Sequence, residues 1–159
     1  MNDKPFALQQ SGNGASCSCT LGPEVALMCP KCFEVYRIHQ SGSVFAAADV
    51  GIDLLANIAY HIGCVHCGAS SVAITIDPPI AKAVSELNKL GYKTEMCCSG
   101  HSGDKHNNAF IKFVQEYNFK TLPAGWERDG VFIRSLNNSV SVSMYALACW
   151  VSTLQNIGD

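Results

Sequence analysis

Two pairs of cysteines constrain this chain more than any other feature of its sequence. Both have the C-x-x-C spacing, Cys29-Pro-Lys-Cys32 and Cys64-Val-His-Cys67. A turn of this kind directs two sulfurs to one side, so two turns together supply the four tetrahedral thiolates that zinc prefers. Gly68 follows the second pair, where the backbone of such a turn often needs a positive φ. The sequence therefore predicts a four-cysteine site with zinc as the cofactor.

The insert between the two pairs, residues 33–63, holds 31 residues. It is longer than the roughly 15–20 residues of a compact zinc ribbon. The entropic cost of closing a loop grows only with the logarithm of its length, so this insert is compatible with one site. The alternatives are four buried free cysteines or a redox-active pair, although redox chemistry needs only one pair. A closed set of four thiolates leaves no position for water, so we expect a structural role.

Composition narrows the setting of the protein. The chain has nine cysteines in 159 residues, an odd number, and it lacks the basic start and long apolar stretch of a secretory signal. We therefore expect reduced cysteines and a cytoplasmic protein. No apolar run has the length of a membrane span. The net charge of −2 does not favour nucleic-acid binding, and no feature identifies a protein partner.

The chain divides into three predicted parts. Residues 1–24 are rich in Ser, Gly and Gln and read as a flexible tail. Residues 25–71 form the zinc-binding element with its insert, and residues 72–159 form an α+β sandwich domain. Within the insert, the apolar stretch 44–62 fits either a helix or two pieces of strand. An exposed apolar patch there would make the protein an interaction module.

The predicted sandwich domain has the clearest local signals. Residues 72–76 alternate like a strand, and 78–90 have helical periodicity, with Asp77 as cap and Gly91 as end. Further strands are predicted over 92–98, 109–114 and 130–135, and a last helix runs from a cap at Ser141 or Ser143 to Gly158. We expect an antiparallel or mixed sheet with both helices on one face, a two-layer α/β sandwich joined to a zinc-ribbon-like element. Trp126 is expected in a loop, where it covers the core or stacks on a ligand.

A second cluster of reactive side chains follows the predicted strand 92–98, in the segment CCSGHSGDKHNNA. A structural interpretation puts Cys98 on the apolar strand face with Met96 and makes the next two residues a turn. A ligand-binding interpretation uses free backbone N–H groups for an anion, with cationic or donor side chains around it. The residues predicted to bind the ligand are Cys98, Ser99, Gly100, His101, Lys105 and His106.

A chemical interpretation of the same segment also stays open. Strand alternation puts Cys97 on the polar face with Lys93 and Glu95, where a thiol would be accessible. His101 could then lower its pKa and make it a nucleophile. A second metal bound by Cys97, Cys98 and His101 is a variant of this hypothesis.

The run PPIAKAVSELNKLGYKTEMCCSGH…AFIKF, with LPAGW and FIRS downstream, resembles a recurrent set of small bacterial and phage zinc-ribbon proteins. Their shared motif is G-Y-x-T-x-x-C-C-[S/E]-G-H, and the resemblance covers roughly residues 60–135. It implies the same α+β layout and a role for Cys97, Cys98, Gly100 and His101, but no activity. A weaker resemblance is to the wybutosine-synthesis methyltransferase-like family. Its Ser-Cys-Ser-Gly-Arg turn is matched by Cys98-Ser99-Gly100, whereas His101 stands in place of the arginine.

The functional prediction is a non-enzymatic, zinc-containing binding protein. Its ligand is expected to be a small anion or a nucleotide-like molecule, held at the 98–108 loop. The first alternative is a cysteine-dependent or nucleic-acid-modifying enzyme that uses Cys97 or Cys98 with His101. The second alternative is a protein-interaction module.

Overall fold

The computed structural model describes residues 24–39, 52–54, 60–100 and 108–157. Several expectations fall outside this part of the chain: the tail up to residue 23, much of the apolar stretch 44–62, and loop residues 101–107. The described pieces of that stretch, β3 and β4, are strands, so the two-strand alternative holds there.

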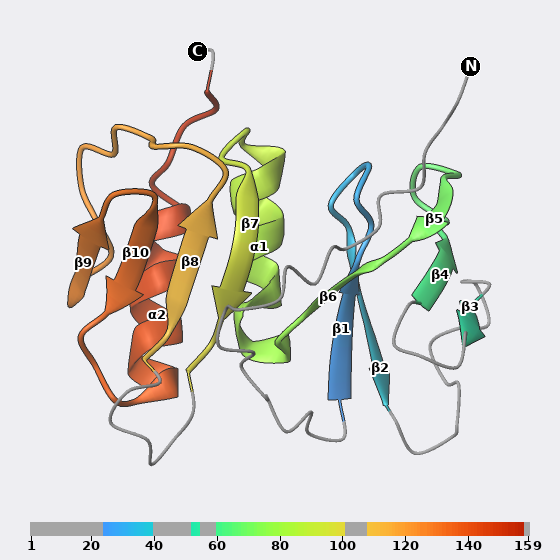
Figure 1. Cartoon of the computed structure of the whole chain (residues 1–159), viewed down its shortest axis with the longest axis horizontal. Helices are drawn as coiled ribbons and strands as arrows, with labels where there is room; N and C mark the ends of the chain where they lie inside the picture. Colours follow the sequence, from blue (N-terminus) through green and yellow to red (C-terminus); the bar gives the residue numbers. More distant parts are fainter. Residues whose placement is uncertain (1–23, 40–51, 55–59, 101–107, 158–159) are drawn as a thin grey trace.

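The described residues form ten strands and two helices (Figure 1). In chain order they are β1 (Glu24–Met28), β2 (Val35–His39), β3 (Ile52–Leu54), β4 (Tyr60–Gly63), β5 (Ser70–Val72), β6 (Ile74–Ile76), α1 (Pro78–Lys89), β7 (Thr94–Cys98), β8 (Phe110–Phe113), β9 (Trp126–Asp129), β10 (Phe132–Ser135) and α2 (Val140–Val151). This content confirms the predicted α+β class.

Three antiparallel sheets organise these strands, in the orders β2-β1-β6, β3-β4-β5 and β7-β8-β10-β9. Strand β6 lies in the first sheet, where Ala26 of β1 is opposite Ile76. The chain then passes directly into α1, so the first sheet is tied to the helical part by one residue, Asp77. Figure 1 shows α1 and α2 side by side along the four-stranded sheet.

The main core lies between the two helices and the four-stranded sheet. The predicted stripe of α1 is buried through Ile80, Val84 and Leu87, in one cluster with residues of β8, β10 and α2. Trp150 of α2 belongs to this cluster, and its indole Nε1 donates a hydrogen bond to the Thr121 carbonyl at 2.9 Å. The aromatic ring of Trp150 is therefore packed in the core, and its one polar atom has a hydrogen-bond partner.

Both ends of α1 lie close to the predicted positions, but the cap differs. Gly91 follows the helix with a φ of 95°, a conformation that glycine adopts without strain. Asp77 occupies the N-cap position, yet its side chain makes no cap hydrogen bond. The carboxylate accepts from Ser99 instead, so the expected local cap is replaced by a tertiary contact.

The bounds predicted for α2 were wrong at both ends. The helix begins at Val140 and ends at Val151, and Ser143 lies inside it rather than at its cap. The Ser143 hydroxyl is buried and pairs with that of Ser135 on β10 at 2.6 Å. The buried position of Ser143 is thus explained by its hydrogen bond to Ser135, a contact that the sequence alone does not reveal.

The strand β9 was not predicted, because three charged residues follow Trp126 and hide any alternation. It pairs with β10 as an edge strand, with Trp126 opposite Ser135. Charged side chains are typical of edges, where they discourage pairing with another chain. Trp126 is only 6% exposed and belongs to the core, so the loop placement was wrong and the core role is confirmed.

The side-chain alternation predicted for residues 92–98 was also wrong. The strand starts at Thr94, and its pairing with β8 shifts register between Thr94 and Met96. Such a bulge inserts one residue and exchanges the faces beyond it. Met96 is therefore 49% exposed instead of packed inside, and Cys97 packs against the core instead of lying on the polar face.

Candidate metal centre

The two C-x-x-C turns converge, as predicted. The sulfur atoms of Cys29, Cys32, Cys64 and Cys67 all lie within 4.8 Å of one another. The Sγ atoms of Cys29 and Cys67 are 3.8 Å apart, and those of Cys32 and Cys64 are 3.5 Å apart. None of the four cysteines is in a disulfide. The four side chains could therefore hold one metal ion between them.

The two turns share one backbone pattern. In the first, the Phe33 N–H donates to the Cys29 carbonyl at 2.9 Å; in the second, the Gly68 N–H donates to the Cys64 carbonyl at 2.7 Å. Both donors have positive φ, 61° at Phe33 and 70° at Gly68. The glycine was predicted for this reason. Phe33 takes the same conformation without a glycine's freedom, so contacts of its own must hold it there.

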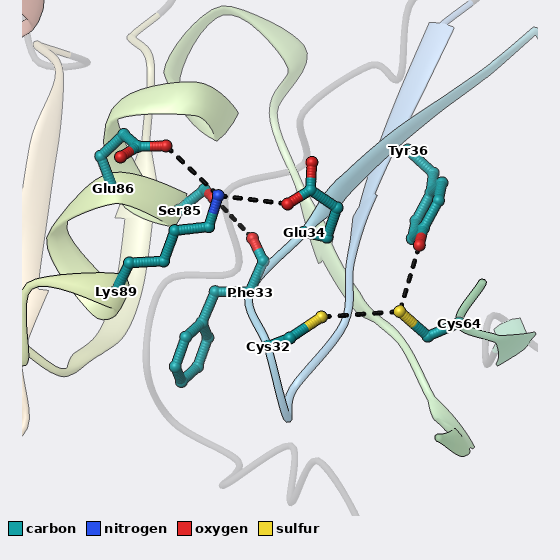
Figure 2. A network of polar contacts seen from close by, with 8 residues as sticks. All are labelled: Cys32, Phe33, Glu34, Tyr36, Cys64, Ser85, Glu86 and Lys89. Atoms are coloured by element: carbon teal, nitrogen blue, oxygen red, sulfur yellow. Dashed lines mark hydrogen bonds and ion pairs between the residues drawn. The ribbon is translucent and has the colours of Figure 1, made fainter. Parts of the chain in front are cut away.

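Helix α1 provides these contacts (Figure 2). The Ser85 hydroxyl donates to the Phe33 carbonyl at 2.5 Å, and Lys89 forms an ion pair with Glu34 at 3.2 Å. The Lys93 ammonium lies 4.0 Å from the centre of the Phe33 ring. The first cysteine turn is thus docked onto α1 through its backbone and an ion pair. Its aromatic ring contacts Lys93, which lies between α1 and β7.

The cluster is closed to solvent on its inner side. Cys29 is 0% exposed and Cys64 is 1% exposed, while Cys32 and Cys67 are half-buried. Leu27 packs in the same small core as these side chains. His66, which lies between the cysteines of the second pair, is exposed. Such enclosure is typical of a structural site, because water has little access to a bound ion.

Tyr36 adds a polar contact that the sequence did not suggest. Its hydroxyl oxygen lies 3.1 Å from the Cys64 sulfur (Figure 2). Burial by itself raises the pKa of Cys64, but hydrogen bonds, above all from Tyr36, outweigh it and bring that pKa to about 6. Burial raises the pKa of Cys32 to about 12. The contacts around Cys64 therefore favour its thiolate form, which a cation would stabilise.

The second predicted site is described only at its beginning. The Ser99 N–H and hydroxyl both donate to the Asp77 carboxylate, at 3.0 and 3.3 Å, and the Gly100 N–H contacts the Cys98 sulfur at 3.4 Å. The two amide groups expected to face an anion thus have partners within the protein. The contact between Asp77 and Ser99 was not predicted, because the position of Asp77 before α1 suggests a helix cap.

The remaining residues of this predicted site, His101, Lys105 and His106, lie outside the described residues. Cys97 and Cys98 point to opposite sides of β7, where they pair with Ile111 and Phe110. Burial, and then the charges of Asp77 and Cys98, raises the pKa of the Cys97 thiol to about 12. In the part of the chain that the structure describes, only the four-cysteine cluster brings metal-binding side chains together.

No protein-family model, curated protein or solved structure matches the chain. Across the described ranges, neither helix has the length and apolar character needed to cross a membrane. The functional assignment therefore rests on the geometry of the sites.

Proposed function

We propose that the protein is a non-enzymatic binding protein whose fold depends on one structural zinc ion, held by Cys29, Cys32, Cys64 and Cys67. The spacing of the sulfur atoms carries this proposal. With zinc–sulfur bonds of about 2.3 Å, an ideal tetrahedron separates its sulfurs by about 3.8 Å. Two of the sulfur–sulfur separations, 3.5 and 3.8 Å, are close to this value. A set of thiolates alone also favours zinc over harder cations.

The proposed ion stabilises the fold rather than a reaction. Four protein ligands fill its coordination sphere, so no position is left for water or substrate. Bound zinc joins the turn after β1 to the turn after β4, and the first of these turns is docked on α1 through Ser85 and Lys89. The four-cysteine segment thus acts as a zinc-ribbon-like element that is anchored on a two-layer α/β body.

The ligand of this protein is a small anion or a nucleotide-like molecule that binds at the 98–108 loop. The contact of Ser99 with Asp77 supports a fixed start for this loop, as does the positive φ of Gly100, which is 84°. Because the first two amide groups are already used, His101, Lys105 and His106 supply the donors and positive charge.

Calorimetric titration with inorganic phosphate and with adenosine 5′-monophosphate (AMP) tests the loop. His101→Ala should weaken the binding of AMP or phosphate about tenfold, the value of a charge-assisted hydrogen bond, without changing zinc content or melting temperature. His66→Ala is the matched control, because this histidine is exposed on the second cysteine turn. Unchanged affinity in His101→Ala, or loss of its fold, would count against a ligand-binding role.

A further inference from the structure

One face of the four-stranded sheet carries aromatic side chains on its two central strands. In β8 and β10 the inward side chains are buried in the core, and the alternate ones point away from it. We call this second set, with the exposed Met96 of β7, the outer face: Met96, Phe110, Lys112, Phe132 and Arg134.

The outer face places flat groups next to one another. Phe110 is opposite Arg134 in the register of β8 and β10, and Phe132 is opposite Lys112. The two phenyl rings lie 6.2 Å apart between centroids, and the Arg134 guanidinium is 5.0 Å from the centre of the Phe132 ring. Nucleobases stack on aromatic rings and on guanidinium planes, and a four-stranded sheet with aromatics on its central strands is one arrangement that uses this.

Charge decides what kind of nucleotide this face suits. Lys112 is paired with Glu95 at 2.8 Å, Arg134 is paired with Asp129 at 3.8 Å, and Glu127 lies opposite Arg134. Three carboxylates beside two cations disfavour a strand with many phosphates. They are compatible with a ligand that has a single phosphate. The long, exposed pair with Asp129 contributes little, so Arg134 can exchange it for a phosphate.

The position of these residues connects them to the ligand loop. Phe110 pairs with Cys98 across β7 and β8, so Phe110 and Arg134 lie at the end of the sheet where the 98–108 segment joins these two strands. We propose that the outer face binds the base of a mononucleotide, with Phe110 and Phe132 as the stacking platform and Arg134 as a phosphate contact. This inference rests on the proposed function, which places the ligand at the same end.

Calorimetric titration of the zinc-loaded full chain with AMP, adenosine and inorganic phosphate tests this assignment. AMP should bind more tightly than either adenosine or phosphate. Phe110→Ala should weaken AMP binding about tenfold, as expected for a lost stacking partner. Arg134→Gln should weaken AMP binding but leave adenosine binding unchanged. Tyr145→Ala is the matched control, because this tyrosine is 75% exposed on α2, and its AMP affinity should equal that of the wild type.

Several results would overturn the assignment: no AMP binding, AMP binding no tighter than phosphate, or unchanged AMP affinity in both Phe110→Ala and Arg134→Gln. Tight binding of a ten-nucleotide single strand without AMP binding would also overturn it, in favour of a nucleic-acid surface. If Phe110→Ala does not fold, the exposed Arg134→Gln variant decides. If only His101→Ala loses AMP binding, the stacking platform on the outer face is wrong and the ligand loop stands. If only Phe110→Ala loses AMP binding, the role of the ligand loop is wrong and the stacking platform stands.

Discussion

Among single residues, those around the four-cysteine cluster show how the protein prepares a buried site for a cation. The hydrogen bond from Tyr36 lowers the pKa of Cys64, and Gly68 gives its turn the required left-handed backbone. The role of Gly68 was predictable, because the positive φ that it provides is required by the turn itself. Tyr36 was not, because it is 28 residues away from Cys64 in sequence and only the packing of β2 brings it there.

Replacing Tyr36 with phenylalanine removes the hydroxyl that contacts the Cys64 sulfur and leaves the ring in place. A hydrogen bond to a metal ligand orients that ligand and tunes the metal site, so zinc affinity should fall about tenfold. Competition with a chromophoric chelator measures this affinity. Tyr145→Phe, on the exposed face of α2, should leave it unchanged, and equal affinities in both variants would remove Tyr36 from the site.

The substitution Gly68→Ala isolates the cost of the backbone conformation. A Cβ atom at this position meets nothing within 4 Å, so no clash contributes, but its φ of 70° disfavours any side chain. The free energy of unfolding of the zinc-loaded protein should fall by about 1 kcal/mol. Denaturant titration measures it. An unchanged unfolding midpoint would mean that the turn can relax without this conformation.

Cys97 should be a poor nucleophile. Its thiol is protonated at neutral pH, because burial and the charges of Asp77 and Cys98 raise its pKa to about 12, and the thiolate is the reactive form. Iodoacetamide labelling followed by peptide mass spectrometry should therefore show much slower labelling at Cys97 than at the exposed Cys149. The rate at Cys97 should still be rising at pH 10. Faster labelling at Cys97 than at Cys149 would instead support the alternative hypothesis of a cysteine-dependent enzyme.

At the scale of helices and strands, the sequence predicted those elements whose bounds depend on interactions between neighbouring residues. Helix α1 was found because its periodicity, Pro78 and Gly91 all act within the helix itself. Strand β9 and the bulge in β7 were missed, because pairing with β10 and β8 determines them. The start of α2 was misplaced for the same reason, since Ser143 is explained by Ser135 on another strand.

The docking of the first cysteine turn on α1 can be tested through Ser85. Its hydroxyl is buried and donates to the Phe33 carbonyl, so Ser85→Ala leaves that carbonyl without this partner. The free energy of unfolding should fall by about 1–2 kcal/mol. Lys82→Ala, on the exposed side of the same helix, is the control and should change it little. Equal stability of the two variants would mean that the turn is not held by this hydrogen bond.

At the scale of the whole molecule, two distant segments meet at the four-cysteine cluster, and the proposed zinc ion would hold them together. The sequence predicted this meeting from two matched turns, whose chemistry is independent of the fold between them. The sequence did not indicate which sheet each cysteine turn belongs to, or that the first turn would pack against α1. The pairing of β6 with β1 makes this arrangement continuous, because it joins the four-cysteine region to the helix that begins at Pro78.

Elemental analysis of the purified full chain is the most direct test of this account. We expect one zinc per chain in the wild type and in the Cys97→Ala/Cys98→Ala variant, and loss of that zinc in Cys64→Ser. A wild-type protein without zinc, or with iron in its place, would contradict it. So would a second metal that disappears in the double variant, because the CCSGH segment would then be a metal site itself.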